Sequence, residues 1–170
     1  MNSIVFIMPE TNALVTGCML LYSVSSDSTA CLWKLVPSDN DDRGLVGIRL
    51  ARISGQHNRA ITSCAWDPQR RNLVTASLDG MVRLFAIKSS LRSGIDCETS
   101  SASGFDLESF AKPLNSFSTQ FQPINAMVLV ESKIVVGCWN GTLWIFKPNV
   151  QREEKVRILF SIYRHNLSGF

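Results

Sequence analysis

Residues 57–87 constrain the fold of this chain more than any other stretch. They contain three short apolar runs, ITSCAW, NLVTASL and MVRLFAI, separated by the turn pairs Asp67-Pro68 and Asp79-Gly80. Short runs rich in β-branched and aromatic residues, bounded by turn residues, predict β-strands. An Asp-Gly pair between two such runs predicts a hairpin with a primed turn, in which both central residues have positive φ. The stretch therefore predicts a three-stranded antiparallel meander.

The same pattern occurs in two other places. Residues 20–35 (LLYSVSSDSTACLWKL) and residues 134–146 (IVVGCWNGTLWIF) align with it. In each copy an aromatic residue follows the turn residue by six positions, and the pairs are Asp27 and Trp33, Asp79 and Phe85, and Asn140 and Phe146. Three coincidences of turn residue, strand and aromatic residue indicate one module that is repeated along the chain.

A fourth apolar run follows each meander, at residues 45–53, 113–119 and 156–163. Residues 3–9 supply the first strand of the first copy. We therefore expect an all-β protein of about three four-stranded antiparallel units, at residues 1–55, 56–119 and 120–164. His165 lies at the repeat position of His57, so residues 165–170 are expected to begin a further repeat.

Two polar stretches make the spacing of the units unequal. Residues 37–44 (PSDNDDRG) interrupt the first unit, and residues 88–112 interrupt the second. The second stretch is rich in Ser and Gly, a composition that buries too little apolar surface to order itself. We expect both to be insertions between the third and fourth strands, the second a mobile surface loop.

These units resemble WD repeats, the blades of β-propellers. The family's blade carries Gly-His before the first strand, Asp in the turn between the second and third strands, and Trp-Asp at the end of the third. Here Gln56-His57 stands at the Gly-His position, and Trp33 alone keeps the Trp. The resemblance implies a partial, divergent propeller. It also assigns structural repeat positions, which are Asp27, Trp33, His57, Asp79, Phe85, Asn140, Phe146 and His165.

The resemblance further implies how a blade is fastened. In the family, hydrogen bonds link the His, a Ser or Thr of the second strand, the turn Asp and the Trp. The second unit offers His57, Thr75 or Ser77, and Asp79, but Phe85 has no N–H group to donate. The other two units lack the His. We therefore expect no unit to build the full set, and the blades to depend more on packing.

His57, Ser77 and Asp79 could also be interpreted as a hydrolase triad. Their strand-turn-strand context favours burial between blades, and nothing Gly-rich or helical presents a nucleophile. The sequence contains no phosphate loop, dinucleotide fingerprint or zinc-ligand spacing, and its adjacent carboxylates, Asp41-Asp42 and Glu153-Glu154, lie in stretches expected to be polar loops. We expect no enzyme activity, no cofactor and no metal.

The five cysteines include no CxxC pair, and three of them, Cys31, Cys64 and Cys138, lie in strand-like runs. This usage favours a reducing compartment. The N-terminus is a poor signal peptide, and no apolar run has the length of a membrane span. We expect an intracellular protein, cytoplasmic or nuclear, without a membrane partner.

Binding of protein partners is the function that the resemblance implies. In propellers, the loop before the first strand and the turn between the second and third strands open on one rim. By repeat position, the candidate partner-binding residues are Asn58, Arg59, Leu78, Phe121, Gln122 and Trp139. Trp139 is the sharpest candidate because a hairpin does not require an aromatic residue before its turn, although packing on a neighbouring blade would explain it equally well. The resemblance predicts an interaction scaffold, within a multi-subunit complex.

Nucleic acid is the alternative partner. The net charge of +3 is too small to indicate it alone. An arginine-rich rim would be needed, drawn from Arg43, Arg49, Arg52, Arg59, Arg70 and Arg71.

Closure of the ring is a separate question. A propeller typically needs about four to eight blades, and an arc of three leaves two apolar faces bare. The chain could be a segment of a longer propeller, a shortened gene product, or a half that closes with another copy or another protein.

Overall fold

The computed structural model describes residues 4–8, 19–38, 41–87, 111–131, 133–148 and 158–159. Every regular element within these residues is a β-strand. The strands are β1 (Ile4–Met8), β2 (Met19–Val24), β3 (Ala30–Ser38), β4 (Asp41–Ile53), β5 (Ile61–Asp67), β6 (Asn72–Ser77), β7 (Met81–Ile87), β8 (Ala111–Ser118), β9 (Ile124–Val130), β10 (Lys133–Cys138), β11 (Thr142–Phe146) and β12 (Ile158–Leu159).

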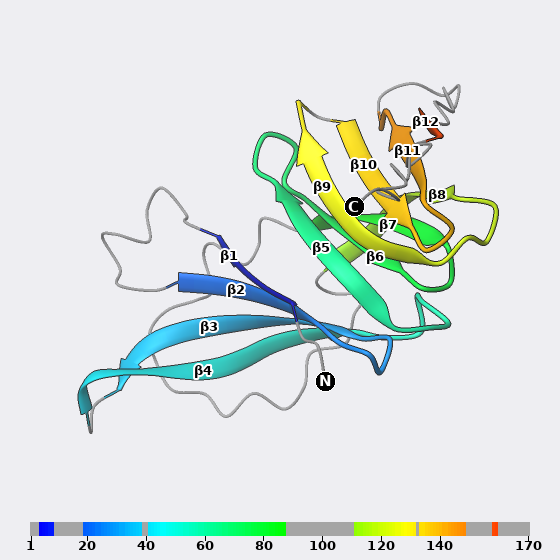
Figure 1. The fold of residues 1–170 in the computed structure, drawn as a ribbon. Coiled ribbons are helices and arrows are strands. Elements are labelled where there is room, and N and C mark those ends of the chain that lie inside the picture. The colour runs from blue at the N-terminus through cyan, green and yellow to red at the C-terminus, as the bar shows by residue number, and fades with distance from the viewer. Residues whose placement is uncertain are drawn as a thin grey trace, which may run out of the picture.

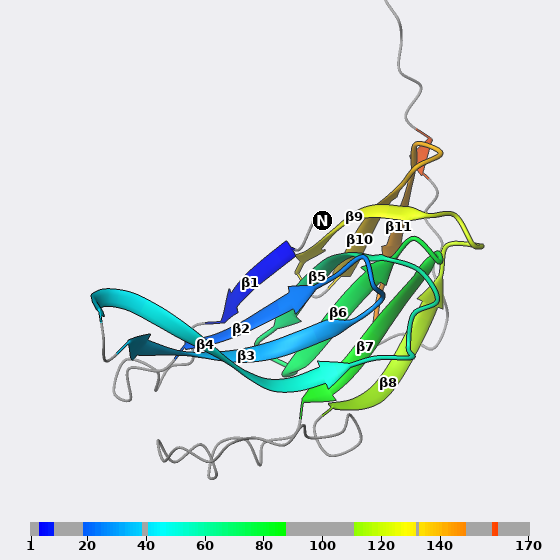
Figure 2. The same cartoon turned by 90° about the horizontal axis from the view of Figure 1, so that it is seen from below.

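The strands form three four-stranded sheets, each an antiparallel meander in chain order. The first sheet is β1-β2-β3-β4, the second is β5-β6-β7-β8, and the third is β9-β10-β11-β12. The second sheet lies between the other two (Figure 1 and Figure 2). The all-β architecture of repeated four-stranded sheets predicted from the sequence is confirmed.

Burial along each strand shows how many faces of its sheet are covered. All six residues of β6 are buried, whereas buried and half-buried residues alternate along β10. Because side chains alternate between the faces of a sheet, a continuous buried run requires cover on both faces and alternation requires cover on one. The second sheet is therefore packed on both faces, and the third on one.

Two hydrophobic clusters fill the two spaces between the sheets. The first cluster joins Tyr22, Leu32 and Ile53 of the first sheet to Leu73 and Phe85 of the second. The second cluster starts from the opposite face of the second sheet, and its large members there and on the third sheet are Val74, Leu84, Phe117, Ile134, Val136, Trp144 and Phe146. Leu73 and Val74 are neighbours in β6, so a shift of one residue in the pairing of β6 would exchange the two cores.

The turn between β6 and β7 differs from the expected primed turn. Residues 78–80 form a three-residue loop, in which Gly80 N–H donates to the Ser77 carbonyl at 3.1 Å. Gly80 has a φ of +77°, whereas Asp79 is not among the residues with positive φ. The equivalent left-handed positions in the other two sheets are Ser28 and Gly141. The prediction of positive φ at both central residues is wrong, because the third loop residue lets Gly80 alone reverse the chain.

Residues 37–44 are not an insertion outside the sheet. The strand β3 continues to Ser38, and β4 begins at Asp41, so the two strands form a long hairpin. Leu45, Val46 and Ile48 in this hairpin are exposed.

Some expectations fall outside the described residues. These are the predicted mobile loop, apart from residues 111–112 in β8, and His165 with residues 165–170. Of the expected strand at 156–163, Ile158–Leu159 is described. The unit boundaries at 55, 119 and 164 stay a prediction.

Candidate functional site

The loops at one end of the strands form a continuous rim across the three sheets. Backbone hydrogen bonds join successive loops: Ile61 N–H donates to the Ser25 carbonyl at 3.1 Å, and Leu78 N–H donates to the Ala60 carbonyl at 2.9 Å. Further along, Thr119 N–H donates to the Gly80 carbonyl at 3.0 Å, and Trp139 N–H donates to the Pro123 carbonyl at 3.0 Å. The rim loops are therefore fixed to one another by the backbone.

A buried polar network anchors the centre of this rim. His57 Nδ1 lies 2.9 Å from Asp79 Oδ2, and His57 Nε2 lies 2.9 Å from Thr75 Oγ1. A carboxylate only accepts hydrogen bonds, so Nδ1 carries the proton and donates to Asp79. The same carboxylate oxygen accepts Asn58 N–H at 3.1 Å, and the other oxygen accepts Met81 N–H at 2.9 Å. The network ties β6, the turn before β7 and the loop before β5 together.

The electrostatics of Asp79 follow from this geometry. Partial burial opposes the charged carboxylate, but hydrogen bonds from His57, Met81 N–H and Asn58 N–H outweigh it and hold the pKa of Asp79 below its ordinary value of 3.8. In the first sheet, hydrogen bonds from Thr29 and Ser25 lower the pKa of Asp27. Asp79 differs from Asp27 in that it accepts a hydrogen bond from a buried histidine, His57.

The three turns share one local device. In each, the turn carboxylate or amide oxygen accepts the backbone N–H two residues further on. The three donors are Thr29, Met81 and Thr142, at 3.0, 2.9 and 3.1 Å respectively. This equivalence agrees with the alignment of Asp27, Asp79 and Asn140 that the sequence predicted.

Aromatic residues at the end of the third strand are held differently in each sheet. In the first sheet, Trp33 Nε1–H donates to Ser23 Oγ at 2.8 Å. Phe85 of the second sheet is buried in the first cluster. Phe146 of the third sheet stacks on Trp144, with ring centroids 6.2 Å apart. His57 belongs to the second sheet and Trp33 to the first. Neither of these two sheets therefore contains the full set of His, Ser or Thr, Asp and Trp that fastens a blade in the family.

His57, Ser77 and Asp79 do not form a catalytic triad. Ser77 Oγ donates to the Arg59 carbonyl at 3.0 Å and accepts Asp79 N–H at 3.1 Å, while Thr75 occupies the second nitrogen of His57. His57 and Ser77 are both buried. A serine nucleophile must reach the imidazole and a substrate, and Ser77 reaches neither.

Phe121 is the most exposed large apolar residue of the rim. The residue is 79% exposed, and both Phe121 and Gln120 have left-handed φ angles, of 62° and 58°. A left-handed conformation costs a residue with a Cβ about 1–2 kcal/mol. Thr119 maintains it, since its hydroxyl lies 2.7 Å from the Gln122 carbonyl and 3.0 Å from the Gly80 carbonyl.

Gly80 is required by the same loop. A Cβ atom at Gly80 would lie 2.6 Å from Phe121 Cα, closer than van der Waals contact allows. The absence of a side chain at Gly80 therefore lets the backbone of Phe121 approach the turn and present its ring to solvent.

Trp139 lies at the next turn of the rim and is 66% exposed. Its indole Nε1–H donates to Asn125 Oδ1 at 3.3 Å, which holds the ring over the start of β9. Within the described residues, Trp139 belongs to neither of the two clusters between the sheets. Trp144 and Trp66 are the tryptophans that contribute to the clusters, the second with its ring stacked on Tyr22 at a centroid distance of 5.9 Å.

The remaining candidates lie on the same rim. Asn58 and Arg59 are exposed in the loop before β5. Leu78 is half-buried in the loop that contains Gly80, and Gln122 is half-buried in the loop between β8 and β9. All six candidate residues therefore belong to loops that the backbone hydrogen bonds connect.

The arginines do not gather at this rim. Arg59 precedes β5, whereas Arg70 and Arg71 lie in the turn after β5, at the opposite end of the sheet. Arg70 pairs with Asp67 at 2.9 Å, and Arg52 lies 3.7 Å from Asp27. Local carboxylates thus compensate two of the positive charges, and the geometry does not support a single arginine-rich rim.

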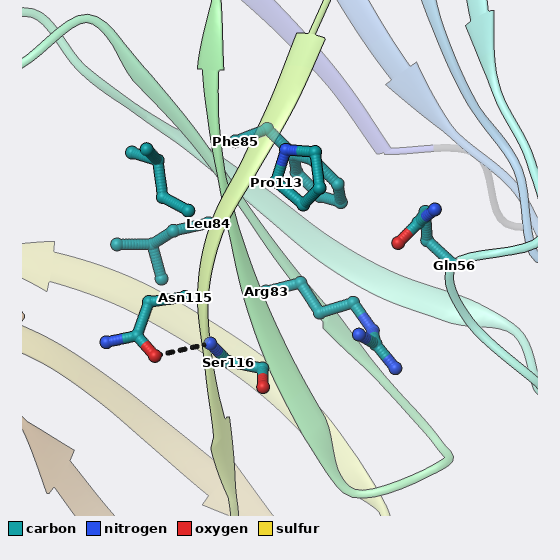
Figure 3. Close-up of a pocket in the computed structure, with 8 residues that line it drawn as sticks. Gln56, Arg83, Leu84, Phe85, Pro113, Asn115 and Ser116 are labelled. Carbon is teal, nitrogen blue, oxygen red and sulfur yellow. Dashed lines mark hydrogen bonds between the residues drawn. The ribbon is translucent and has the colours of Figure 1, made fainter. Parts of the chain in front are cut away.

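A shallow hollow of about 280 Å³ opens beside β7 and β8, next to Gln56 in the loop before β5 (Figure 3). Gln56, Arg83, Asn115 and Ser116 are among its lining residues, and Ser116 N–H donates to Asn115 Oδ1 at 2.8 Å. Arg83 Nε is buried there without a hydrogen-bond partner. No acid, His or Cys lines the hollow, so its lining contains no set for acid-base or metal chemistry.

The described part of the chain holds no group of His, Cys, Asp and Glu side chains that could bind a metal ion. Cys31, Cys64 and Cys138 are free thiols, and burial raises the pKa of Cys64 to about 12, which disfavours its thiolate form. A search of the described residues found no helix that could cross a membrane.

The fold and the rim define a class of protein: a partial β-propeller of four-stranded blades. Residues 48–85 match the WD domain, G-beta repeat family. This stretch runs from the last strand of the first sheet through three strands of the second, so one sequence repeat bridges two blades. Residues 48–85 are a WD repeat, and the surrounding sheets have the fold of a partial, divergent WD-type propeller.

No curated protein sequence matches the chain. Among solved structures, the chain is similar to Sqt1 of Saccharomyces cerevisiae, a WD-repeat protein, with 15% sequence identity and a TM-score of 0.53. The alignment covers 81% of this chain and 31% of Sqt1, so the chain spans about a third of the length of that protein. At this identity the likeness concerns the fold.

Proposed function

We propose that this protein is a non-catalytic interaction scaffold that binds partner proteins through the rim centred on Phe121 and Trp139. The observation that carries the proposal is the exposure of these two aromatic residues, at 79% and 66%, on loops that backbone hydrogen bonds join to one another. Water-exposed aromatic residues lose apolar hydration when a partner covers them, and aromatic residues and Arg dominate interface hot spots.

The strain in the Phe121 loop supports the same proposal. Two successive left-handed residues cost stability, and such strain clusters at functional sites. Folding alone gains nothing from holding a phenylalanine in water. Pre-ordering of the ring lowers the entropy that a partner must overcome on binding, which is the benefit that a rigid rim provides.

The class of partner follows from the composition of the rim. Phe121 and Trp139 offer apolar contacts, Arg59 a positive charge, and Asn58 and Gln122 amide groups. A protein surface with apolar side chains and nearby carboxylates complements this set. An intracellular multi-subunit assembly is the setting we infer, because the WD-repeat fold is typical of scaffolds and the free thiols of Cys31, Cys64 and Cys138 suit a reducing compartment.

Affinity capture with matched variants tests the proposal. Wild type, Phe121→Ala, Trp139→Ala and Arg59→Ala are compared with Leu114→Ala, which removes an exposed apolar side chain on β8 instead of the rim. We expect the rim variants to lose the same bound proteins while their thermal stability changes little, and Leu114→Ala to retain those proteins. Retention of every bound protein by the rim variants would overturn the assignment.

A further inference from the structure

Arg83 carries a half-buried charge that has no partner in the described part of the chain. It lies on β7, and its side chain borders the hollow on the side where Gln56 lies (Figure 3). Its Nε is buried without a hydrogen-bond partner, and none of the described carboxylates pairs with its guanidinium. Arg70, also half-buried, pairs with Asp67 at 2.9 Å. Arg83 therefore differs from Arg70 in lacking a compensating charge.

The repeat does not require a charge at this position. Cys31 and Trp144 follow the turn residues of their own sheets at the same distance as Arg83 follows Asp79. The equivalent positions of the first and third sheets are thus occupied by uncharged side chains. An arginine keeps its charge on burial, and partial removal of water from an unpaired charge opposes folding. A charge at this position is unfavourable for the fold alone and is suited to binding an anion.

The surroundings of Arg83 indicate the kind of anion. No acid lines the hollow, so the positive charge of Arg83 is not compensated there. Gln56 and Ser116 add polar groups to the lining, and Pro113 adds apolar surface. One guanidinium matches the single charge and planar shape of a carboxylate, whereas a phosphate group carries about two negative charges at neutral pH. Because the hollow is shallow, it can cover one side chain but cannot enclose a whole small molecule.

We propose that this hollow binds the carboxylate of an aspartate or glutamate side chain on a partner protein, through the guanidinium of Arg83. Charge-assisted hydrogen bonds from the guanidinium to the carboxylate compensate the water that Arg83 loses on burial. The site is separate from the rim, because Phe121 and Trp139 do not line the hollow. It therefore adds an acidic-peptide site to the rim function proposed above.

Ser116 allows an internal version of the same contact. It pairs in register with Arg83 across β7 and β8, so the two side chains lie on one face of the sheet. Ser116→Glu places a carboxylate beside the guanidinium, and Ser116→Gln adds similar bulk without the charge. We expect Ser116→Glu to unfold at the higher urea concentration of the two, and the difference to disappear when Arg83→Gln is added. Equal unfolding midpoints would overturn the proposal.

Binding to the full chain is measured by nuclear magnetic resonance, from the signals of Arg83 Nε–H and of the backbone N–H of residue 116. The probe is a pool of blocked pentapeptides with a central glutamate and random flanking residues, and the matched pool has a central glutamine. We expect saturable shifts with the glutamate pool alone. Arg83→Gln and Ser116→Glu should each weaken binding at least about tenfold, whereas Phe121→Ala should bind as wild type does.

Shifts with both pools, or with neither, would overturn the proposal, as would undiminished binding by Arg83→Gln. Inorganic phosphate is the second probe, and tighter binding of phosphate than of the glutamate pool would also contradict the assignment to a carboxylate. Arg83→Gln tests the hollow and Phe121→Ala tests the rim, so the failure of one proposal is distinguishable from the failure of the other.

Discussion

Replacement of Asp79 by Ala tests how the polar network stabilises the rim. Asp79 accepts hydrogen bonds from His57 Nδ1–H, Asn58 N–H and Met81 N–H. The His57 side chain is 1% exposed, so water cannot replace the lost acceptor. Leaving a buried donor unpaired costs about 1–3 kcal/mol, and loss of the turn hydrogen bond to Met81 adds about 1 kcal/mol. We expect Asp79→Ala to lower the free energy of unfolding by about 2–4 kcal/mol.

Asp27→Ala is the matched control. Asp27 occupies the same repeat position and accepts the same turn hydrogen bond, from Thr29 N–H, but its side chain is 57% exposed and has no histidine partner. Its removal should cost about 1 kcal/mol or less. Urea unfolding of both variants, followed by circular dichroism, isolates the histidine contribution as the difference between the two costs. Equal costs would refute the reasoning.

Three further outcomes follow from the turns. Ser28→Gly should raise the free energy of unfolding by about 0.5–1 kcal/mol, because Ser28 has a φ of 68° that glycine adopts freely; thermal unfolding measures the gain. Gly80→Ala should destabilise by more than about 2 kcal/mol and weaken partner capture, since its Cβ would collide with Phe121 Cα. Acid should destabilise wild type more than Asp79→Asn. The folded pKa of Asp79 lies below 3.8, so its carboxylate contributes stability above that value and loses it as pH falls toward the folded pKa; urea unfolding at a series of pH values shows the slope.

The strands and their repeat were predictable from local chemistry. Runs such as NLVTASL are short, largely apolar and bounded by turn residues, and the spacing from Asp79 to Phe85 recurs in all three units. The choice between Thr75 and Ser77 as the partner of His57 was not predictable, because both lie on the same strand two residues apart. Their distances from the imidazole depend on how the loop before β5 crosses the end of β6, which the sequence does not state.

The sequence predicted which residues lie on the candidate rim. It did not predict which of their side chains are exposed or what holds the loops in place. The sequence placed Phe121 and Trp139 near turns but left open whether Trp139 would be buried, because an aromatic residue beside a turn can face either a core or solvent. Thr119 gave no signal of its own. Its role depends on contacts with the Gly80 carbonyl, which is distant in sequence and adjacent only after the sheets pack.

The central claim is that the second sheet packs between the first and third sheets, which are copies of the same repeat. Methyl nuclear Overhauser effects test this arrangement most directly. Leu73 and Val74 are adjacent in β6 and point to opposite faces. The fold predicts contacts from Leu73 methyls to Leu32 or Ile53, from Val74 methyls to Ile134 or Val136, and none in the crossed combinations. Contacts of both residues with one and the same neighbouring sheet would contradict the side-by-side arrangement of the blades.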